Sequence, residues 1–301
     1  MYKVTSKWPH QNSIHVEWNL GKRCNLDCAY CPAEIHDNHS PHTNIKVLLD
    51  TVDALAELDK PIRLSLTGGE PCVHPDIEDL LDHAKQRLDW INVTTNGLRP
   101  GQWYAERNVD HYVFSLHFDN EHWERALNNI VLFAQLNEDR DHIPFQVNVM
   151  AHHDYMGEVK LAVARLHGHN IRYVIRRIRW TEKHDWFDDM RYNQNDLDWI
   201  LKTNATALPN CVIDDEKQMH ANDIIKQHLN QFEGWRCSAG IESLMINWDG
   251  DVHRATCRVG GSLGNIYDGS FEQPTEWITC TRKWCTCAAD IPLTKVLNVK
   301  N

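Results

Sequence analysis

The sequence lacks several features that identify whole classes of protein. No run approaches the roughly 20 apolar residues of a membrane-spanning helix. The first residues, MYKVTSKWPHQNSIHVEW, have no apolar segment behind a basic head, as a secretory leader would. No internal repeat or low-complexity segment is present. These absences predict a soluble, cytoplasmic protein that does not bind membranes.

The chain also lacks an excess of positive charge. Its formal net charge is −11. Because nucleic-acid backbones are bound by clustered Lys and Arg, we expect no nucleic-acid partner. One local basic stretch, IRYVIRRIRW, carries Arg172, Arg176, Arg177 and Arg179. These side chains either bind an anionic ligand or form ion pairs with the abundant Asp and Glu side chains at the surface.

Length and composition predict a folded protein with one large domain and a smaller one. The chain has 301 residues, 42% of them hydrophobic. Short strand-like apolar runs lie at 14–20, 62–67, 91–96, 112–117, 145–150 and 171–176. Segments of helical period follow them at 43–58, 75–88, 101–108, 121–137 and 155–168. This alternation predicts an α/β fold with a parallel sheet and helices outside it.

The pattern changes after about residue 190. We place a boundary there, which gives domains 1–190 and 191–301, and we expect helices near 194–206 and 216–232. The stretch SLMINWDGDVHRATC predicts a β-hairpin, because two apolar runs flank Asp249-Gly250. That dipeptide supplies the positive φ of a tight turn.

Cysteine is abundant, with ten residues. In a reducing compartment, clustered cysteines bind metal or react rather than form disulfides. Cys24, Cys28 and Cys31 follow the first predicted strand, where parallel α/β folds build their sites. Zinc usually takes four ligands, and no fourth cysteine is near, whereas three thiolates on a four-iron cluster leave one iron open. A zinc knuckle or incidental thiols are the alternative.

The motif CNLDCAYC, with Tyr30 before its last cysteine, resembles the signature loop of the radical S-adenosylmethionine superfamily. LTGGEP, at the end of the second predicted strand, resembles the motif of that family that receives the amino group of S-adenosylmethionine. Its candidate residues are Gly68, Gly69, Glu70 and Pro71. Glycines let the chain approach a ligand closely. The resemblance implies a partial (β/α)6 barrel, a [4Fe-4S] cluster on the three cysteines, and an adenine near Tyr30.

Polar residues at later strand ends are weaker matches. They are Thr95, Asn96, Ser115 and Asn148. The resemblance places such residues near the ribose or the carboxylate of S-adenosylmethionine. The alternatives are an Asn-Gly turn for Asn96 and a hydrogen-bonded core hydroxyl for Ser115. His117, His152 and His153 also lie at predicted strand ends, but 19 histidines are spread along the chain, so we assign them no role.

The tail holds five cysteines: Cys237, Cys257, Cys280, Cys285 and Cys287. Their order around the predicted hairpin resembles the SPASM and twitch domains, which implies a small α+β domain with an auxiliary [4Fe-4S] cluster. Gly250 lies farther from Cys257 than in the SPASM pattern, and too few cysteines remain for two clusters, so one cluster of twitch type fits better. We expect the ligands Cys237, Cys257, Cys285 and Cys287, with Cys280 as substitute. A structural zinc site is the alternative, and Cys72 and Cys211 are expected to be lone thiols.

The resemblance also implies a reaction. One electron, from a donor such as flavodoxin or ferredoxin, cleaves S-adenosylmethionine to methionine and a 5′-deoxyadenosyl radical, which takes a hydrogen atom from a peptide or small metabolite. The auxiliary cluster could accept electrons, bind substrate or brace the fold. Dehydrogenation of a small-molecule alcohol and a non-catalytic scaffold for zinc or iron-sulfur are the alternatives. No catalytic acid or base stands out.

Overall fold

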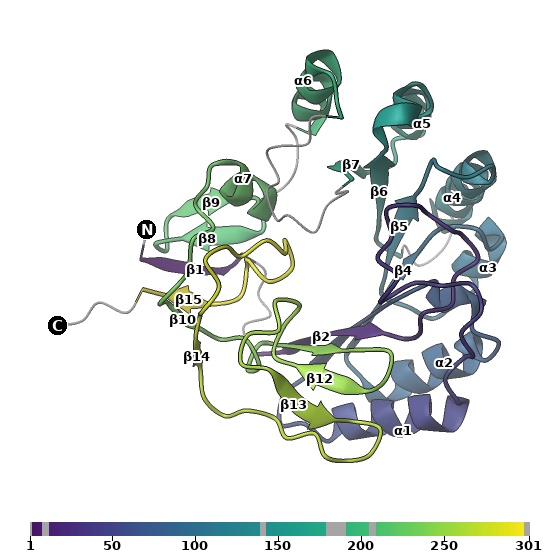
Figure 1. Cartoon of the computed structure of the whole chain (residues 1–301). Helices are drawn as coiled ribbons and strands as arrows, with labels where there is room; N and C mark the ends of the chain where they lie inside the picture. The colour runs from purple at the N-terminus through teal and green to yellow at the C-terminus, as the bar shows by residue number, and fades with distance from the viewer. Residues whose placement is uncertain (1, 8–11, 139–142, 179–190, 205–208, 298–301) are drawn as a thin grey trace. The chain divides into compact units, whose positions relative to one another are not determined.

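The computed structural model describes residues 2–7, 12–138, 143–178, 191–204 and 209–297 (Figure 1). Arg179 and the predicted boundary at 190 lie outside them. Two compact units are built from separate segments: Met1–Trp18, Asp50–Leu64 and Ala207–Asn301 form the first, and Asn19–Leu49 with Ser65–Thr206 form the second. The division into 1–190 and 191–301 stays a prediction. Within the described ranges, every helix is too short or too polar to cross a membrane.

The second unit carries parallel strands with helices between them. The strands, in spatial order, are β3 (Ile62–Thr67), β4 (Trp90–Thr95), β5 (His111–Leu116), β6 (Phe145–Ala151) and β7 (Tyr173–Arg177). The helices are α1 (Ile45–Ala56), α2 (Ile77–Arg87), α3 (Gly101–Ala105), α4 (Trp123–Glu138) and α5 (Met156–Gly168). The division between the units passes through α1 and β3. Helices α2 to α5 lie along one face of these strands (Figure 1).

The side chains of β5 show why this sheet forms. Tyr112, Phe114 and Leu116 are buried and alternate with partly exposed residues, which is the period-two pattern of a strand. Tyr104 from α3 and Phe133 from α4 pack on the buried aromatic rings. The helix-covered face is therefore apolar, and the other face and the strand ends are left for polar groups.

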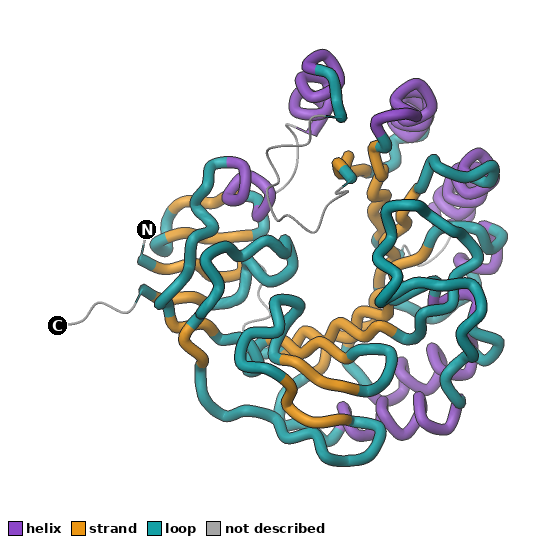
Figure 2. Tube along the Cα trace, viewed as in Figure 1, coloured by secondary structure: helices purple, strands orange, loops and turns teal. Residues whose placement is uncertain are grey.

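The first unit carries short strands in two arrangements. One has the order β13 (Ser262–Asn265), β12 (Asp251–His253), β11 (Ser243–Ile246) and β2 (Ile14–Asn19), with β2 and β11 parallel. The other has the order β14 (Ile278–Thr279), β10 (Arg236–Cys237), β15 (Lys295–Val296), β1 (Lys3–Ser6), β8 (Cys211–Ile213) and β9 (Lys217–Met219). Figure 2 shows that loops make up most of the chain between the short strands of the tail.

The predicted α/β class is confirmed, because β2 to β7 and α1 to α5 alternate along the chain at the predicted positions. The predicted hairpin is confirmed as β11 and β12, with Gly250 at φ +86°. Helix α6 (Gln194–Thr203) confirms the helix expected near 194–206.

The helix predicted over 216–232 is wrong. Residues 217–219 form β9, and α7 spans only Ala221–Lys226. Asp214 and Asp215 adopt φ of 52° and 62°, in the left-handed region that aspartate tolerates better than most residues. The resulting turn sends β9 back along β8, which pairs with β1 at the other end of the sequence. That long-range pairing overrides the local helical pattern.

Candidate functional site

Cys24, Cys28 and Cys31 lie in the loop after β2, as predicted. The Cys24 amide donates to the Asp37 carbonyl at 2.7 Å, and the Asp37 amide donates to the Lys22 carbonyl at 2.9 Å. The Cys31 amide donates to the Cys28 carbonyl at 2.9 Å, so these two cysteines share a tight turn. One internally bonded loop therefore presents all three sulfur atoms.

The turn Gly68-Gly69-Glu70 packs directly on the backbone of that loop. The Gly69 amide donates to the Gly21 carbonyl at 2.8 Å, and the Glu70 amide donates to the Arg23 carbonyl at 2.9 Å. A Cβ on Gly69 would lie 2.3 Å from the Arg23 carbonyl oxygen, and Gly68 has φ +119°. The two glycines thus have a structural role beside the predicted one, because they let the two loops meet backbone to backbone.

Glu70 is a buried carboxylate that joins two strand ends. Its Oε1 accepts from Thr95 Oγ1 at 2.8 Å and from the Cys72 amide at 2.9 Å, and its Oε2 accepts from the Asn96 amide at 2.6 Å. Burial raises the pKa of Glu70, and these donors act in the opposite direction. The Asn96 side chain donates to Asn25 Oδ1 at 2.7 Å, which connects the strand ends to the cysteine loop.

Tyr30 contacts two histidines. Its ring stacks with His117 at 5.9 Å between centroids, and the His152 ring lies at 6.0 Å. Burial raises the pKa of Tyr30 and lowers the pKa of His117 to about 4. The phenol therefore keeps its proton, and its oxygen shares a hydrogen bond with Nδ1 of a neutral His117, 2.5 Å away. Sequence reasoning assigned His117 no role, and its only sequence signal was its place at the end of β5.

Most of the predicted residues line one cavity of about 270 Å³. Those that line it are Cys24, Cys28, Tyr30, Cys31, Gly68, Gly69, Glu70, Thr95, Asn96 and Ser115. Lining residues that were not predicted are Leu26, Pro32, His36, Thr67, Thr94 and His117. The cavity lies at the carboxyl ends of β3, β4 and β5, where parallel sheets bind their ligands.

Two predicted residues lie away from this cavity's lining. Pro71 starts the short 3-10 helix η1 (Pro71–Val73), directly after Glu70. Asn148, on β6, accepts at Oδ1 from Arg176 Nε and from Gln146 Nε2, both at 3.0 Å. Asn148 therefore orients a cation of the basic stretch, and its predicted contact with a cofactor stays a prediction.

Asp119 is a carboxylate beside the cysteine loop that sequence reasoning missed. Its Oδ2 accepts from the Ala29 amide at 3.0 Å. Burial and then the Asp119 charge raise the pKa of Cys31 to about 11, and burial is also the main cause that raises the pKa of Cys24 to about 11. The free thiols are therefore protonated at neutral pH, and a metal or cluster must displace their protons.

The five tail cysteines gather in the first unit although they come from separate segments. The Cys237 thiol interacts electrostatically with Cys280, and the Cys257 thiol interacts with both. The Cys285 thiol interacts with Cys257 and Cys287. Burial raises the pKa of Cys257 to about 11 and that of Cys287 to about 12. The five thiols therefore lie near one another, and which of them bind a metal or cluster stays a prediction.

Zinc and a four-iron cluster require different spacings of their cysteine ligands. Four thiolates bound to zinc at about 2.3 Å lie about 3.8 Å from one another. In the part of the chain that the structure describes, no three cysteine sulfurs come within 4.8 Å of one another.

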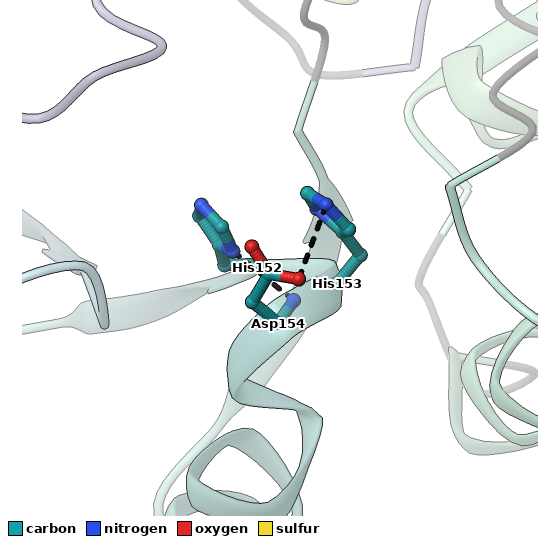
Figure 3. A group of neighbouring side chains, drawn as sticks. All are labelled: His152, His153 and Asp154. Carbon is teal, nitrogen blue, oxygen red and sulfur yellow. Dashed lines mark hydrogen bonds and ion pairs between the residues drawn. The ribbon is translucent and has the colours of Figure 1, made fainter.

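A different group meets that distance criterion, namely His152, His153 and Asp154 (Figure 3). His152 Nδ1 accepts from the Asp154 amide at 3.2 Å and so caps the 3-10 turn η2 (His153–Tyr155). His153 Nε2 lies 3.4 Å from Asp154 Oδ1, and the two imidazole rings are stacked, 11° from parallel. The group is explained as the start of α5 rather than as a metal site.

Comparison with known proteins agrees with this geometry. The family model described as the radical SAM superfamily matches residues 18–139. The antilisterial bacteriocin subtilosin biosynthesis protein AlbA of Bacillus subtilis is 32% identical over 84 residues, which is 28% of this chain and 18% of AlbA. GTP 3′,8-cyclase of Pelotomaculum thermopropionicum is 40% identical over 88 residues, which is 28% of this chain and 27% of the cyclase. The matches thus span less than a third of these relatives.

The fold is also found in a solved structure of anSMEcpe with bound AdoMet and the Cp18Cys peptide. The TM-score is 0.55 at 15% sequence identity, and the similarity covers 86% of this chain and 78% of that one. At this identity the similarity shows a shared fold, and it extends well beyond the segment that the family model matches.

Proposed function

Residues 18–139 belong to the radical SAM superfamily, and on this premise we propose that the chain is an enzyme that cleaves S-adenosylmethionine and takes a hydrogen atom from a peptide. The observation that carries the proposal is the cavity in which the three cysteines of one loop meet Glu70 and the strand ends at Thr95 and Ser115. When bound there, a [4Fe-4S] cluster supplies the electron that splits S-adenosylmethionine into methionine and a 5′-deoxyadenosyl radical.

Cys24, Cys28 and Cys31 are the proposed protein ligands of that cluster. Three thiolates leave one of four irons without a protein ligand, so the amino and carboxylate groups of S-adenosylmethionine can reach it. Gly69 and Glu70 anchor this loop to the neighbouring strand end through the two backbone hydrogen bonds to Gly21 and Arg23. The position of the cysteines relative to the rest of the cavity is therefore set before any ligand binds.

The remaining lining residues hold S-adenosylmethionine in this proposal. Glu70 Oε2 accepts one hydrogen bond among the described contacts, from the Asn96 amide, so it can also accept one from the ammonium of the methionyl group. Tyr30, fixed by His117, offers a flat ring beside the adenine. Asn96 and Ser115 offer polar groups to the ribose or the carboxylate. Such fixed positions matter because a carbon radical attacks nearly any C–H bond.

The tail is proposed to hold an auxiliary [4Fe-4S] cluster on Cys237, Cys257, Cys285 and Cys287, with Cys280 as substitute. Support comes from the mutual electrostatic interactions of these thiols. Asp290 Oδ2 accepts from the Cys257 amide at 3.1 Å, and the Asp290 amide donates to the Cys287 carbonyl at 3.1 Å. One buried residue therefore ties two of the separate segments together.

A peptide is the proposed substrate class. The name of AlbA refers to biosynthesis of a bacteriocin, and the anSMEcpe structure contains a bound peptide. A small metabolite is the second candidate, because GTP 3′,8-cyclase, whose name refers to a nucleotide, is also similar to this chain. A flavodoxin- or ferredoxin-type protein is the proposed electron donor.

Anaerobic reconstitution with iron and sulfide tests the proposal. We expect about eight irons per chain, as two four-iron clusters require. After reduction with dithionite, S-adenosylmethionine should yield 5′-deoxyadenosine. Its addition should also change the electron paramagnetic resonance spectrum of the first cluster.

The substrate class is tested separately with peptides encoded beside the gene, each deuterated and incubated with the loaded enzyme. Transfer of deuterium into 5′-deoxyadenosine, together with a mass change in one peptide, supports a peptide substrate. A colourless protein with tightly bound zinc and no 5′-deoxyadenosine contradicts the whole proposal.

A further inference from the structure

Lys295 is a fully buried lysine in the first unit. Its residue is 2% exposed, although lysine is almost never buried without a partner. The ammonium donates to three backbone carbonyls, those of Asp290 at 2.5 Å, Ile291 at 3.1 Å and Leu293 at 3.2 Å. All three of its protons are thus used by one turn of the tail, which fixes the position of the charge.

The strand register places this charge among the tail cysteines. Lys295 on β15 lies directly opposite Cys237 on the antiparallel strand β10. Directly opposed residues share a face of the sheet, with Cβ atoms about 5 Å apart. The ammonium also interacts electrostatically with Cys285 and Cys211. Two proposed cluster ligands from different segments therefore face the same fixed cation.

Other charged groups also lie near these thiols. Arg254 interacts with Cys237, and its guanidinium donates to the carbonyls of Ala239 and Glu276, both at 3.1 Å. Two carboxyl groups, Asp290 and Glu17, also lie near these thiols, and Asp290 interacts with Lys295 itself. The ammonium of Lys295 differs from these groups in its fixed position, because its three N–H donors are matched by three backbone carbonyl acceptors.

We propose that Lys295 is a fixed cation that raises the reduction potential of the auxiliary cluster. The inference rests on the proposed function, which places a cluster on these cysteines. Reduction adds one electron to a group that already carries the negative charge of its thiolates, so a positive charge a few ångströms away in a low-dielectric interior favours the reduced form. Lys295 thereby makes the cluster a better electron acceptor without coordinating it.

The test uses the full chain with Cys24, Cys28 and Cys31 all changed to Ala, so that only the auxiliary cluster can form. Its potential is measured by redox titration with dithionite, read by electron paramagnetic resonance. Lys295→Met should lower the equilibrium constant for reduction by about tenfold, which equals 59 mV for one electron. Lys295→Arg should stay near the parent value because it keeps the charge.

Lys283→Met is the matched control, because Lys283 is exposed and lies two residues before Cys285. Solvent screens this charge, so its removal should change the equilibrium constant less than threefold. Equal potentials in the Lys295→Met variant and the parent overturn the inference and leave the proposed function intact. Absence of iron from the parent instead contradicts the proposed auxiliary cluster.

A second measurement covers the case in which Lys295→Met does not assemble a cluster. The parent is labelled with ¹⁵N at lysine alone, and the reduced cluster is examined by pulsed electron paramagnetic resonance. A ¹⁵N coupling that disappears in Lys295→Arg supports the inference. A spectrum without ¹⁵N coupling in the parent overturns it.

Discussion

The two cysteine groups of this chain differ in how they are built and in the charges around them. Cys24, Cys28 and Cys31 come from one short loop, and the carboxylates Asp119 and Glu70 act on their thiols. The tail cysteines come from separate segments, and the buried ammonium of Lys295 acts on Cys237 and Cys285. The first group has carboxylates as its charged neighbours, whereas the second has a buried ammonium in addition to the carboxyl group of Asp290.

Under the proposed function, this difference gives the two proposed clusters different surroundings and therefore different reduction potentials. A negative field disfavours the added electron, which lowers the potential and makes a cluster a stronger reductant. A positive field does the reverse. We therefore expect the first cluster to have the lower potential, as reductive cleavage requires, and the auxiliary cluster to have the higher one. The four changes below test that contrast, beginning with the largest expected effect.

Removal of one ligand from each group should separate their tasks. Cys28→Ala is expected to abolish 5′-deoxyadenosine formation, because the first cluster loses a ligand that the loop cannot replace. Cys285→Ala, made together with Cys280→Ala so that the substitute ligand is also absent, should keep that activity while losing about half of the bound iron. Iron content and 5′-deoxyadenosine are measured for both. Cys211→Ala, at a buried thiol that is proposed as a ligand of neither cluster, is the control and should keep both readouts.

Gly69→Ala should separate the two loops that build the first site. The new Cβ would lie 2.3 Å from the Arg23 carbonyl oxygen, so we expect a loss of about 1–3 kcal/mol in unfolding free energy and poor loading of the first cluster only. Denaturant unfolding and iron content are the measurements. Gly21→Ala is the matched control, because nothing lies within 4 Å of its added Cβ. Equal behaviour of the two variants would contradict the close-packing argument.

Asp119→Asn should weaken the negative field around the first group while keeping an oxygen that can accept from the Ala29 amide. We expect a higher potential for the first cluster and 5′-deoxyadenosine formation slower by about tenfold. Asp27→Asn, on an exposed position of the same loop, should change the rate little. An unchanged potential of the first cluster in Asp119→Asn would contradict the role of Asp119 in the charge difference between the two cysteine groups.

Glu17→Gln tests the acidic neighbour of the tail group. Burial and then Asp290 raise the pKa of Glu17 from 4.5 to about 7. The folded state therefore binds more protons than the unfolded state between these values, so stability should fall as pH rises from about 4.5 to about 7 and then level off. The variant should lack this fall, which a pKa raised from 4.5 to about 7 limits to about 3 kcal/mol. The unfolding free energies of the parent and of the variant are compared at pH 5 and pH 8. An equal change in both proteins would contradict the raised pKa of Glu17.

Much of the fold could be predicted because its signals are local. The alternation of apolar runs and helical periods identified β2 to β7 and α1 to α5, and Asp249-Gly250 identified the hairpin. The same reasoning failed over 216–232, where pairing of β8 with β1 fixed the backbone. Hydrophobic periodicity shows which face of one helix or strand is apolar, and it carries no information about a pairing strand about two hundred residues away.

The candidate site, like the fold, combines features that short segments determine with features that only the tertiary structure determines. The sequence alone determined which atoms are offered, because the spacing of Cys24, Cys28 and Cys31 and the Gly68-Gly69-Glu70 turn are properties of short segments. Only the tertiary structure decided what surrounds them: His117 against Tyr30, Asp119 beside the loop, and Lys295 opposite Cys237. Charge and burial depend on neighbours that strand register brings together, and register is set by packing across the whole fold.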